Sequence, residues 1–211
     1  MKTTRVFVCM TLAIASAAIQ AASVAEVVAV RGETHLGAGG PPLSLGQKLD
    51  AGHQIHTGAD GRVRVRFIDG STVVVADRSE LKIERFDAPA DKAREASLVL
   101  EKGLMGQQVS RQAAGKWQVR TPTAVTAVRG TEFFVEVSTD LSTAVSVQSG
   151  EVEVEAIESA ADGTTRKLRP PSKTSLSRPR EGTDCSLARG CTPAALWSPT
   201  RIQAALERLS F

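Results

Sequence analysis

The sequence predicts an all-β fold, either a twisted two-sheet sandwich or a short β-solenoid of many short strands. Over residues 24–157 apolar and polar residues alternate with a period of two, which is typical of strands that bury one face. β-Branched residues are frequent in these segments, and glycine-containing turns recur at about strand-length spacing. No exact repeat is visible, so the sequence leaves both the sandwich and the solenoid open.

Composition and charge limit the classes of protein. The chain has 211 residues and an apolar content of 42%, which is enough to form a sizeable core. Aromatic residues make up only 4%, which argues against a stacking platform for single-stranded nucleic acid. Lys2 and Arg5 account for two of the three net positive charges. We therefore expect no nucleic-acid partner.

The first 22 residues have the three-part pattern of a secretory signal peptide. Lys2 and Arg5 precede an apolar run over residues 6–18, and small residues follow over 16–22. The run is short for a permanent span, and no later segment approaches the roughly 18 apolar residues that a transmembrane helix needs. An uncleaved anchor is the alternative. We expect a cleaved, periplasmic protein whose mature chain has no transmembrane segment.

A single all-β domain is expected over residues 23–158. A strand ends at Arg31, leucines follow a Gly-Gly-Pro-Pro turn at 39–42, and Ile55 precedes a turn at Gly58. The segment 62–67 alternates without exception and Asp69-Gly70 is a favoured two-residue turn, so 62–76 predicts a β-hairpin. Further short strands are expected around 81–83, 98–100, 117–119 and 144–154, the last with a turn at Gly150.

The stretch 121–137 is interpreted as a kinked pair of core strands. The turn-forming pair Thr121-Pro122 opens it, and the sequence Arg129-Gly130-Thr131 interrupts its β-branched run. Phe133 then starts an alternating strand. Because glycine alone adopts a positive φ without steric cost, we expect Gly130 to hold a bulge or a close backbone approach. We expect a carboxylate or backbone carbonyls to anchor Arg129.

Beyond residue 158 the composition changes. The segment 159–197 is rich in Pro, Ser, Thr and Arg, and predicts a linker. Within it, Cys185 and Cys191 are expected to form a disulfide after export, with a metal-binding pair as the alternative. Ser198-Pro199 predicts the start of a short amphipathic helix over 198–211, with Ile202, Leu206 and Leu209 on one stripe. This helix is expected to dock on its own domain or on a partner.

Candidate sites for chemistry are few. His53 and His56 have a spacing that favours opposite faces of a strand, and neither a nucleophile elbow nor a phosphate-binding loop occurs. The carboxylates of two strand segments lie opposite apolar residues, as on a solvated face: Glu132, Glu136, Glu151, Glu153 and Glu155. Arg62, Arg64 and Arg66 form a basic row, which is the candidate interaction face. We therefore expect no enzymatic activity, no catalytic residues, no metal and no cofactor.

The order of several of these motifs resembles the FecR domain over about residues 26–155. The motif residues are Asp69, Gly70, Thr121, Pro122, Arg129, Gly130, Thr131, Phe133 and Gly150. The resemblance implies an extracytoplasmic all-β domain, which in the namesake proteins relays a signal from an outer-membrane transporter to a sigma factor. Those proteins carry a cytoplasmic anti-sigma segment and a transmembrane helix, where this sequence has a signal peptide.

Three functional hypotheses follow. The first is a non-enzymatic periplasmic module for protein interaction or signal sensing in the cell envelope, with an unidentified envelope protein as partner. The second is a module that binds glycan or peptidoglycan through Arg62, Arg64 and Arg66. The third is a transmembrane signalling regulator linked to a sigma factor. A hydrolase that uses Glu132 or Glu151 is a further alternative.

Overall fold

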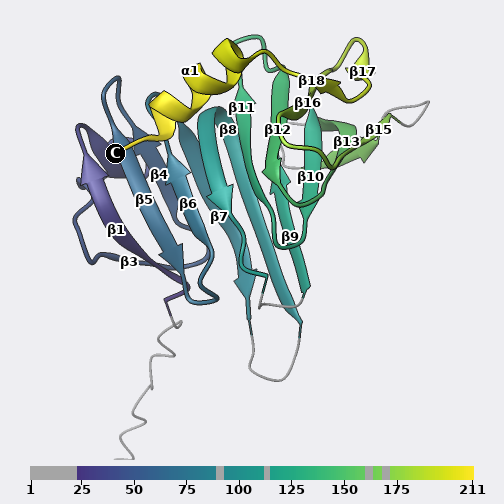
Figure 1. Ribbon diagram of the computed structural model, residues 1–211. Coiled ribbons are helices and arrows are strands. Elements are labelled where there is room, and N and C mark those ends of the chain that lie inside the picture. Colours follow the sequence, from purple (N-terminus) through teal and green to yellow (C-terminus); the bar gives the residue numbers. More distant parts are fainter. Residues whose placement is uncertain (1–22, 89–92, 112–114, 160–163, 168–171) are drawn as a thin grey trace, which may run out of the picture.

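The computed structural model describes residues 23–88, 93–111, 115–159, 164–167 and 172–211. Its strands form one large, non-closed sheet that folds over on itself, so that two layers enclose the core (Figure 1). The predicted all-β class is confirmed, and the two-layer arrangement is that of the sandwich. The expected signal peptide, residues 1–22, lies outside the described residues.

The layer named sheet A here contains the strands on which the C-terminal helix lies. Pairing is antiparallel throughout this layer. Its order is β3 (Lys48–Leu49), β1 (Ala25–Arg31), β5 (Arg62–Phe67), β6 (Thr72–Val75), the second half of β8 (Arg94–Gln108), β11 (Glu132–Val137), β12 (Thr143–Ser149) and β16 (Glu181–Ser186), with β17 (Gly190–Cys191) and β18 (Ala195–Leu196) beside β16.

The second layer, sheet B, shares β8 with sheet A. Its order is β2 (Thr34–Leu36), β4 (Gln54–Thr57), β7 (Glu80–Asp87), the first half of β8, β9 (Gly115–Arg120), β10 (Ala124–Val128), β13 (Val152–Ser159) and β15 (Lys173–Leu176), and β14 (Thr165–Lys167) pairs with the end of β13. All these pairs are antiparallel except β8 with β9.

The strand β8 crosses from one layer to the other at Gly103. Residues before this glycine pair with β7, and residues from it onward pair with β11 and β6. Gly103 has a φ of +86°, and a Cβ there would lie 2.1 Å from the Ser79 Oγ atom. Glycine is the residue that accepts both this backbone geometry and this close approach.

Alternating apolar side chains from both layers meet in one core. In sheet A the inward positions of β5 are Val63, Val65 and Phe67, all almost completely buried. The Phe67 ring stacks on Phe86 of sheet B, with centroids 5.0 Å apart, and meets the edge of Trp117 at 5.2 Å. This aromatic cluster joins the two layers directly.

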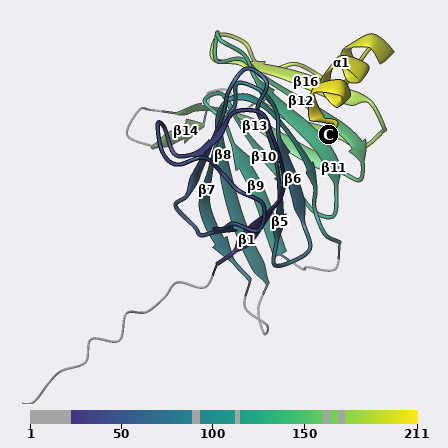
Figure 2. The same ribbon diagram turned by 90° about the vertical axis from the view of Figure 1, so that its left-hand side faces the viewer.

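Helix α1 (Pro199–Leu209) lies on the outer side of sheet A (Figures 1 and 2). A second apolar cluster lies beneath it. The Ser198 side chain accepts a hydrogen bond from the Arg201 backbone N–H and caps the helix, as expected. Ile202 and Ala205 face the sheet and pack near Phe134 and Trp197. The helix therefore docks on its own chain. No helix among the described residues has the length and apolar character to cross a membrane.

The prediction of a linker over 159–197 is wrong for the described part of that segment. The strand β15 extends sheet B, and β16 extends sheet A beside β12. Their hydroxyl side chains are satisfied inside the protein: Thr183 and Thr174 both donate to the Thr192 carbonyl, at 2.6 and 3.0 Å. Composition suggested a linker because it does not reveal such internal partners. Within β16 and β17, Cys185 and Cys191 are joined by a disulfide.

Candidate functional site

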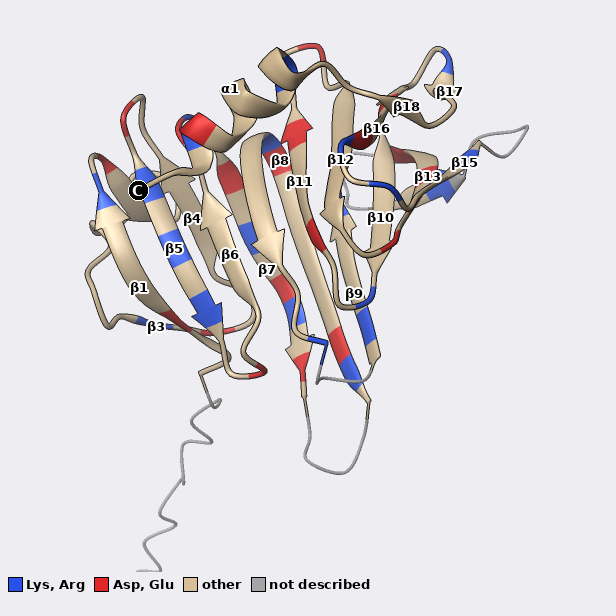
Figure 3. Cartoon of the chain, in the orientation of Figure 1, with Lys and Arg blue, Asp and Glu red and all other residues tan. Residues whose placement is uncertain are grey.

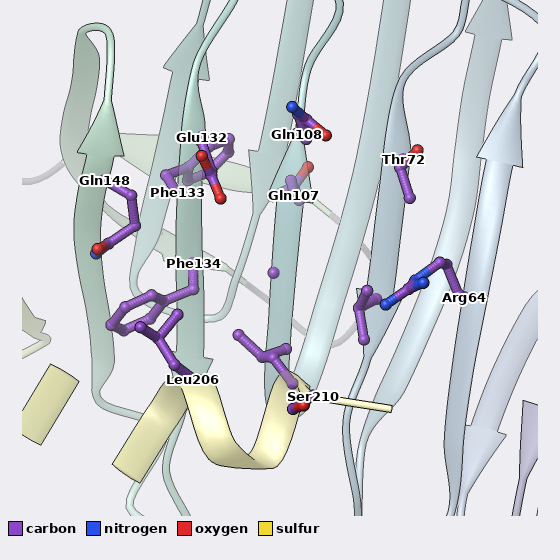
Figure 4. Close-up of a pocket in the computed structure, with 13 residues that line it drawn as sticks. Arg64, Thr72, Gln107, Gln108, Glu132, Phe133, Phe134, Gln148, Leu206 and Ser210 are labelled. Atoms are coloured by element: carbon purple, nitrogen blue, oxygen red, sulfur yellow. The ribbon is translucent and has the colours of Figure 1, made fainter. Parts of the chain in front are cut away.

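An open groove on the outer face of sheet A is the candidate functional site. It encloses about 440 Å³ between the C-terminal half of α1 and strands β5, β6, β8, β11 and β12 (Figure 4). Val74 and Phe134 give it an apolar floor, and Leu206 and Leu209 of α1 form one wall. Arg64, on the far side of the groove from β11, also lines it. The groove thus combines an apolar base with a cation at one side.

The strand register explains which residues the groove exposes. One cross-strand row runs Arg64, Val74, Gly106 and Phe134, and α1 reaches over it, since a Cβ at Gly106 would lie 2.8 Å from Leu209 Cδ1. The next row runs Arg66, Thr72, Gln108 and Glu132. The side chains of Arg66, Gln108 and Glu132 in this second row are exposed. A polar strip therefore lies beside the apolar groove.

The predicted basic row lies along the outer face of β5, beside the groove (Figure 3). Arg66 is exposed, whereas Arg62 and Arg64 are half-buried. The Arg64 guanidinium lies 4.7 Å from the centroid of the Phe211 ring. Within the described residues, none of the three arginines has a carboxylate within ion-pair distance.

The neighbours of the row are mostly cationic or already paired. Arg62 lies opposite Arg31 in the β1–β5 register. Burial, followed by repulsion from Arg31, lowers the pKa of Arg62 below its usual value. Glu26 lies opposite Arg66, but it forms an ion pair with Lys48 at 2.9 Å. That pair, through its hydrogen bond first and its charge second, lowers the Glu26 pKa.

The outer face of sheet B differs, because several of its cations form ion pairs with neighbouring carboxylates. Lys102 and Lys173 bind Glu80 and Glu153 at 2.6 and 2.7 Å. Arg120 pairs with Glu84, and Arg85 with Glu95. Blue and red both occur on β7 and β8 in Figure 3, whereas β5 is blue alone. Ion pairs of this exposed kind are typical of a solvated face, so the row of three unpaired arginines on one strand is the distinctive feature of sheet A.

The ion pairs of Arg208 fix α1 against the sheet next to the basic row. Its guanidinium bonds to Asp77 Oδ1 at 2.9 Å and to Glu136 Oε1 at 2.5 Å. Burial acts to raise the Asp77 pKa, but the hydrogen bond and charge of Arg208 outweigh it and lower the pKa. Burial likewise acts to lower the Arg208 pKa, and the bonds to Asp77 and Glu136 raise it overall. The helix is thus held by charge as well as by apolar packing.

The carboxylates and histidines named from the sequence are dispersed. Glu136 is taken by Arg208, Glu153 by Lys173, and Glu132 lies on the exposed rim of the groove. His56 lies beside Glu80, whereas the His53 ring accepts from the Asp50 backbone N–H. In the described ranges no group of three or more His, Cys, Asp or Glu residues is placed to hold a metal.

The Thr-Pro motif is architectural. Thr121 and Thr123 flank Pro122, and their hydroxyls each lie 2.7 Å from the hydroxyl of the buried Thr143. Thr121 also bonds both to the carbonyl and to the N–H of Ala124, which closes the turn between β9 and β10. Thr123 reaches the carbonyl of Cys185. The motif therefore ties the β9–β10 turn to sheet A.

The residues around Gly130 connect neighbouring turns. Gly130 has a φ of +61°, as expected, and its carbonyl accepts from Arg111 Nε at 3.1 Å. The buried Thr131 hydroxyl donates to the carbonyl of Glu151, next to the positive-φ residue Gly150. Phe133 is in the main core. These contacts link the turn at Gly130 to Arg111 and to the turn at Gly150.

The arginine expected to be anchored in this motif was misassigned. Arg129 is exposed, and the buried arginine is Arg94 at the start of β8, only 2% exposed. Arg94 pairs with Asp69, and its guanidinium lies 5.2 Å from the centroid of the Trp117 ring. Asp69 also accepts from the Ser71 backbone N–H at 2.9 Å and its hydroxyl at 2.8 Å. In the sequence Arg94 stands among the charged residues Asp91, Lys92 and Glu95, which give no signal of its burial.

A second, larger cavity of about 960 Å³ lies near the point where β8 changes layers. It is lined from both sheets and from α1, with His56, Arg78, Lys102 and Glu101 among its polar residues. Most of its charges are already paired with one another. For that reason the groove on sheet A, with its unmatched arginines, is the stronger candidate.

Comparisons with known proteins agree with this fold. Residues 53–153 match the family model described as FecR protein. No curated protein matches the sequence. The fold is similar to two crystal structures of a "putative anti-sigma factor" from Parabacteroides distasonis ATCC 8503, at 2.50 and 1.65 Å resolution, with TM-scores of 0.54 and 0.53 and 22% identity in each case.

The aligned part covers 72% of this chain and 63% or 64% of those chains, so the chain spans less than two thirds of their length. At that identity the likeness concerns the fold. The family match is independent of it and includes every motif residue from Asp69 to Gly150. The segment 53–153 is therefore a FecR domain.

Proposed function

We propose that this protein is a non-enzymatic interaction module of the cell envelope with a signalling or regulatory role. The observation that carries the proposal is the outer face of sheet A, where a groove of about 440 Å³ adjoins three arginines without carboxylate partners among the described residues. A charged surface whose partners are missing, next to an apolar hollow, is typical of a binding face. The FecR domain at residues 53–153 supports the signalling or regulatory role.

A periplasmic location is part of this proposal. The secretory pattern of residues 1–22 supports it, as does the disulfide between Cys185 and Cys191, because such bonds persist in oxidising compartments. Fractionation of cells that express the full chain, with a cysteine-reactive probe of the Cys185–Cys191 bond, checks the location. Recovery of the chain in the cytoplasm with both thiols free would contradict it.

In-cell photo-crosslinking tests the proposed function. A photoreactive amino acid replaces Thr72 or Gln148 at the groove, and Gln118 on the outer face of sheet B serves as the control position. The proposal expects one defined adduct from both groove positions and none from the control. Adducts that form equally from all three positions, or from none under several growth conditions, would overturn it.

The basic row also favours a second candidate, a module that binds glycan or peptidoglycan. A sedimentation assay with purified cell wall decides between the two. Binding that is lost in the variant Arg62→Ser, Arg64→Ser, Arg66→Ser supports the glycan module, and unchanged binding removes the reason for it. A regulator linked to a sigma factor is the third candidate, supported by the family and by the name of the structural neighbours.

A further inference from the structure

We propose that the ligand of the basic row is an extended, acidic peptide segment of a partner protein, with carboxylates at alternate positions. The inference deepens the proposed function and rests on it. It concerns the outer face of β5 and the groove beside it, and not a sheet edge, because β5 is paired on both sides, with β1 and with β6.

The spacing of the three arginines indicates that the ligand is an extended peptide. Arg62, Arg64 and Arg66 alternate along one strand, so they repeat about every 6.6 Å on the same face. An extended peptide places every second side chain on one face with the same repeat, and three of its carboxylates can face the three guanidinium groups in register. A helix presents neighbours at three and four residues and does not match three such positions along a straight row.

The unpaired positive charges of the row favour a negatively charged ligand. Arg62 is half-buried beside Arg31, and the pKa of Arg62 is lowered by burial first and by Arg31 second. Its Nε atom is buried and has no hydrogen-bond partner among the described residues. A carboxylate placed over the row would therefore supply a counter-charge to these guanidinium groups.

The groove gives the peptide an apolar contact as well. Arg64 belongs to the basic row and also lines the groove, whose apolar residues include Val74, Leu206 and Leu209. Exposed ion pairs alone contribute little, typically below about 1 kcal/mol each. A ligand that combines alternate carboxylates with an apolar side chain toward α1 would use both parts of the surface.

Fluorescence anisotropy with synthetic probes tests the inference on the full mature chain. The first probe is a labelled peptide in which threonine and glutamate alternate, with three glutamates. The second has the same composition with its three glutamates consecutive, so that they no longer share one face. We expect the alternating peptide to bind more tightly, and increasing NaCl to weaken it. Equal binding of both peptides would overturn the inference.

Two triple variants locate the binding. The variant Arg62→Gln, Arg64→Gln, Arg66→Gln is expected to weaken the alternating peptide about threefold for each lost pair, or about thirtyfold in all. The matched control, Lys82→Gln, Arg85→Gln, Lys116→Gln, removes the same charge from exposed positions of sheet B and should bind like the wild type. Equal losses in both variants would show a non-specific effect of net charge.

A charge swap covers the case in which the triple variant does not fold. Arg66 is the most exposed of the three, so Arg66→Glu is expected to fold. It should lose the peptide, and a peptide with lysine at one terminal glutamate position should restore the affinity at least partly. If lysine at neither terminal glutamate position of the peptide restores the affinity, the proposed register between peptide and arginines is wrong.

The glycan candidate and the proposed function itself give distinct results. Row-dependent binding of an anionic oligogalacturonate, without binding of either peptide, would overturn the peptide assignment. If neither peptide binds while the groove positions still give their in-cell adduct, the inference fails and the interaction module stands. If the adduct is also absent, both fail.

Discussion

Arg94 is the buried charge at which the two layers of the sheet meet. It lies on sheet B's side of β8, pairs with Asp69 from the β5–β6 turn of sheet A, and stacks against Trp117. Both members of the pair are almost inaccessible to solvent. A charge so placed is tolerated only with its partner present, because desolvation otherwise disfavours it strongly.

Replacing Arg94 with methionine should therefore destabilise the protein by about 3–5 kcal/mol, since Asp69 would remain buried without its counter-charge. The matched control is Arg129→Met, because Arg129 is exposed, and its effect should stay within about 0.5 kcal/mol. Urea denaturation measures both. Equal midpoints for the two variants would show that the buried pair has no structural role.

Glu181 gives a prediction on pH. The backbone N–H groups of Ser177 and Arg178 bond to one carboxylate oxygen at 2.9 Å, and the Arg178 guanidinium bonds to the other. These contacts, in that order, lower the pKa of Glu181 to about 2. The stability they contribute is complete above the unfolded pKa of about 4.3 and is lost as the pH falls toward 2.

Urea denaturation between pH 6 and pH 2 should thus show a decline in stability below about pH 4.3 that is shallower in Glu181→Gln. The variant should also be less stable than the wild type at pH 6, because a neutral amide replaces an anionic acceptor. Parallel pH profiles for the two proteins would contradict the assignment.

At the scale of single residues, the sequence indicated the glycine but not the arginine. Gly130 interrupts an otherwise regular β-branched run, and a glycine at such a position is typical of a backbone with positive φ. The burial of Arg94 depends on Asp69, which is 25 residues away in the sequence. Contacts at such separations leave no local sequence pattern, so the burial of Arg94 could not be predicted from the sequence.

At the scale of elements, β8 organises the fold because it is a single strand of 15 residues in both layers. The sequence showed only the apolar residues near Leu98 and a glycine after them. Gly103 permits the crossing, since its φ is positive and an added Cβ there would lie 2.1 Å from the Ser79 Oγ atom. Turn signals alone do not distinguish a strand that ends from a strand that changes layers.

The variant Gly103→Ala is expected to destabilise the protein by more than about 2 kcal/mol, because the added Cβ would lie 2.6 Å from the Ser79 Cα atom. Gly52→Ala is the control: Gly52 has a φ of +93° but open space around the Cβ position. Its cost should be about 1 kcal/mol, that of the positive φ alone. Thermal and urea denaturation of both variants check the difference, and similar losses would mean that the close approach is unimportant.

The helix α1 was expected to be short and amphipathic, and its attachment depends on residues just before it. Trp197 is 8% exposed and contacts Gly182, where a Cβ would lie 2.2 Å from the indole. Trp197→Ala should cost about 3 kcal/mol and increase the exposure of the groove. Its neighbour Leu196 is 58% exposed, so Leu196→Ala should change the free energy of unfolding little. Equal losses in the free energy of unfolding for the two variants would show that Trp197 does not hold α1 against the sheet.

At the scale of the whole molecule, residues from Val24 to Ala205 contribute to the two apolar clusters. The sequence identified the all-β class because a period of two is a local signal. It missed the strands between residues 172 and 197 because polar threonines and serines in them form internal hydrogen bonds. It also could not place the parallel pair of β8 and β9, which depends on the global topology.

The surroundings of the basic row also depend on the fold of the whole molecule. The sequence found Arg62, Arg64 and Arg66 on one face of a hairpin, but their significance depends on what surrounds them. Sheet B pairs several of its cations with carboxylates, whereas the three arginines of sheet A have no ion pair among the described residues and lie beside a groove that α1 helps to form. Only the fold shows that contrast.

The most direct test of the proposed interaction face measures the in-cell adduct at Gln148 in two backgrounds. One carries Arg62→Gln, Arg64→Gln, Arg66→Gln, and the other carries Lys82→Gln, Arg85→Gln, Lys116→Gln, with equal expression and equal melting temperature as controls. We expect the adduct to be lost in the variant that lacks the three arginines and retained in the sheet B control. An adduct of the same yield in both would contradict this expectation.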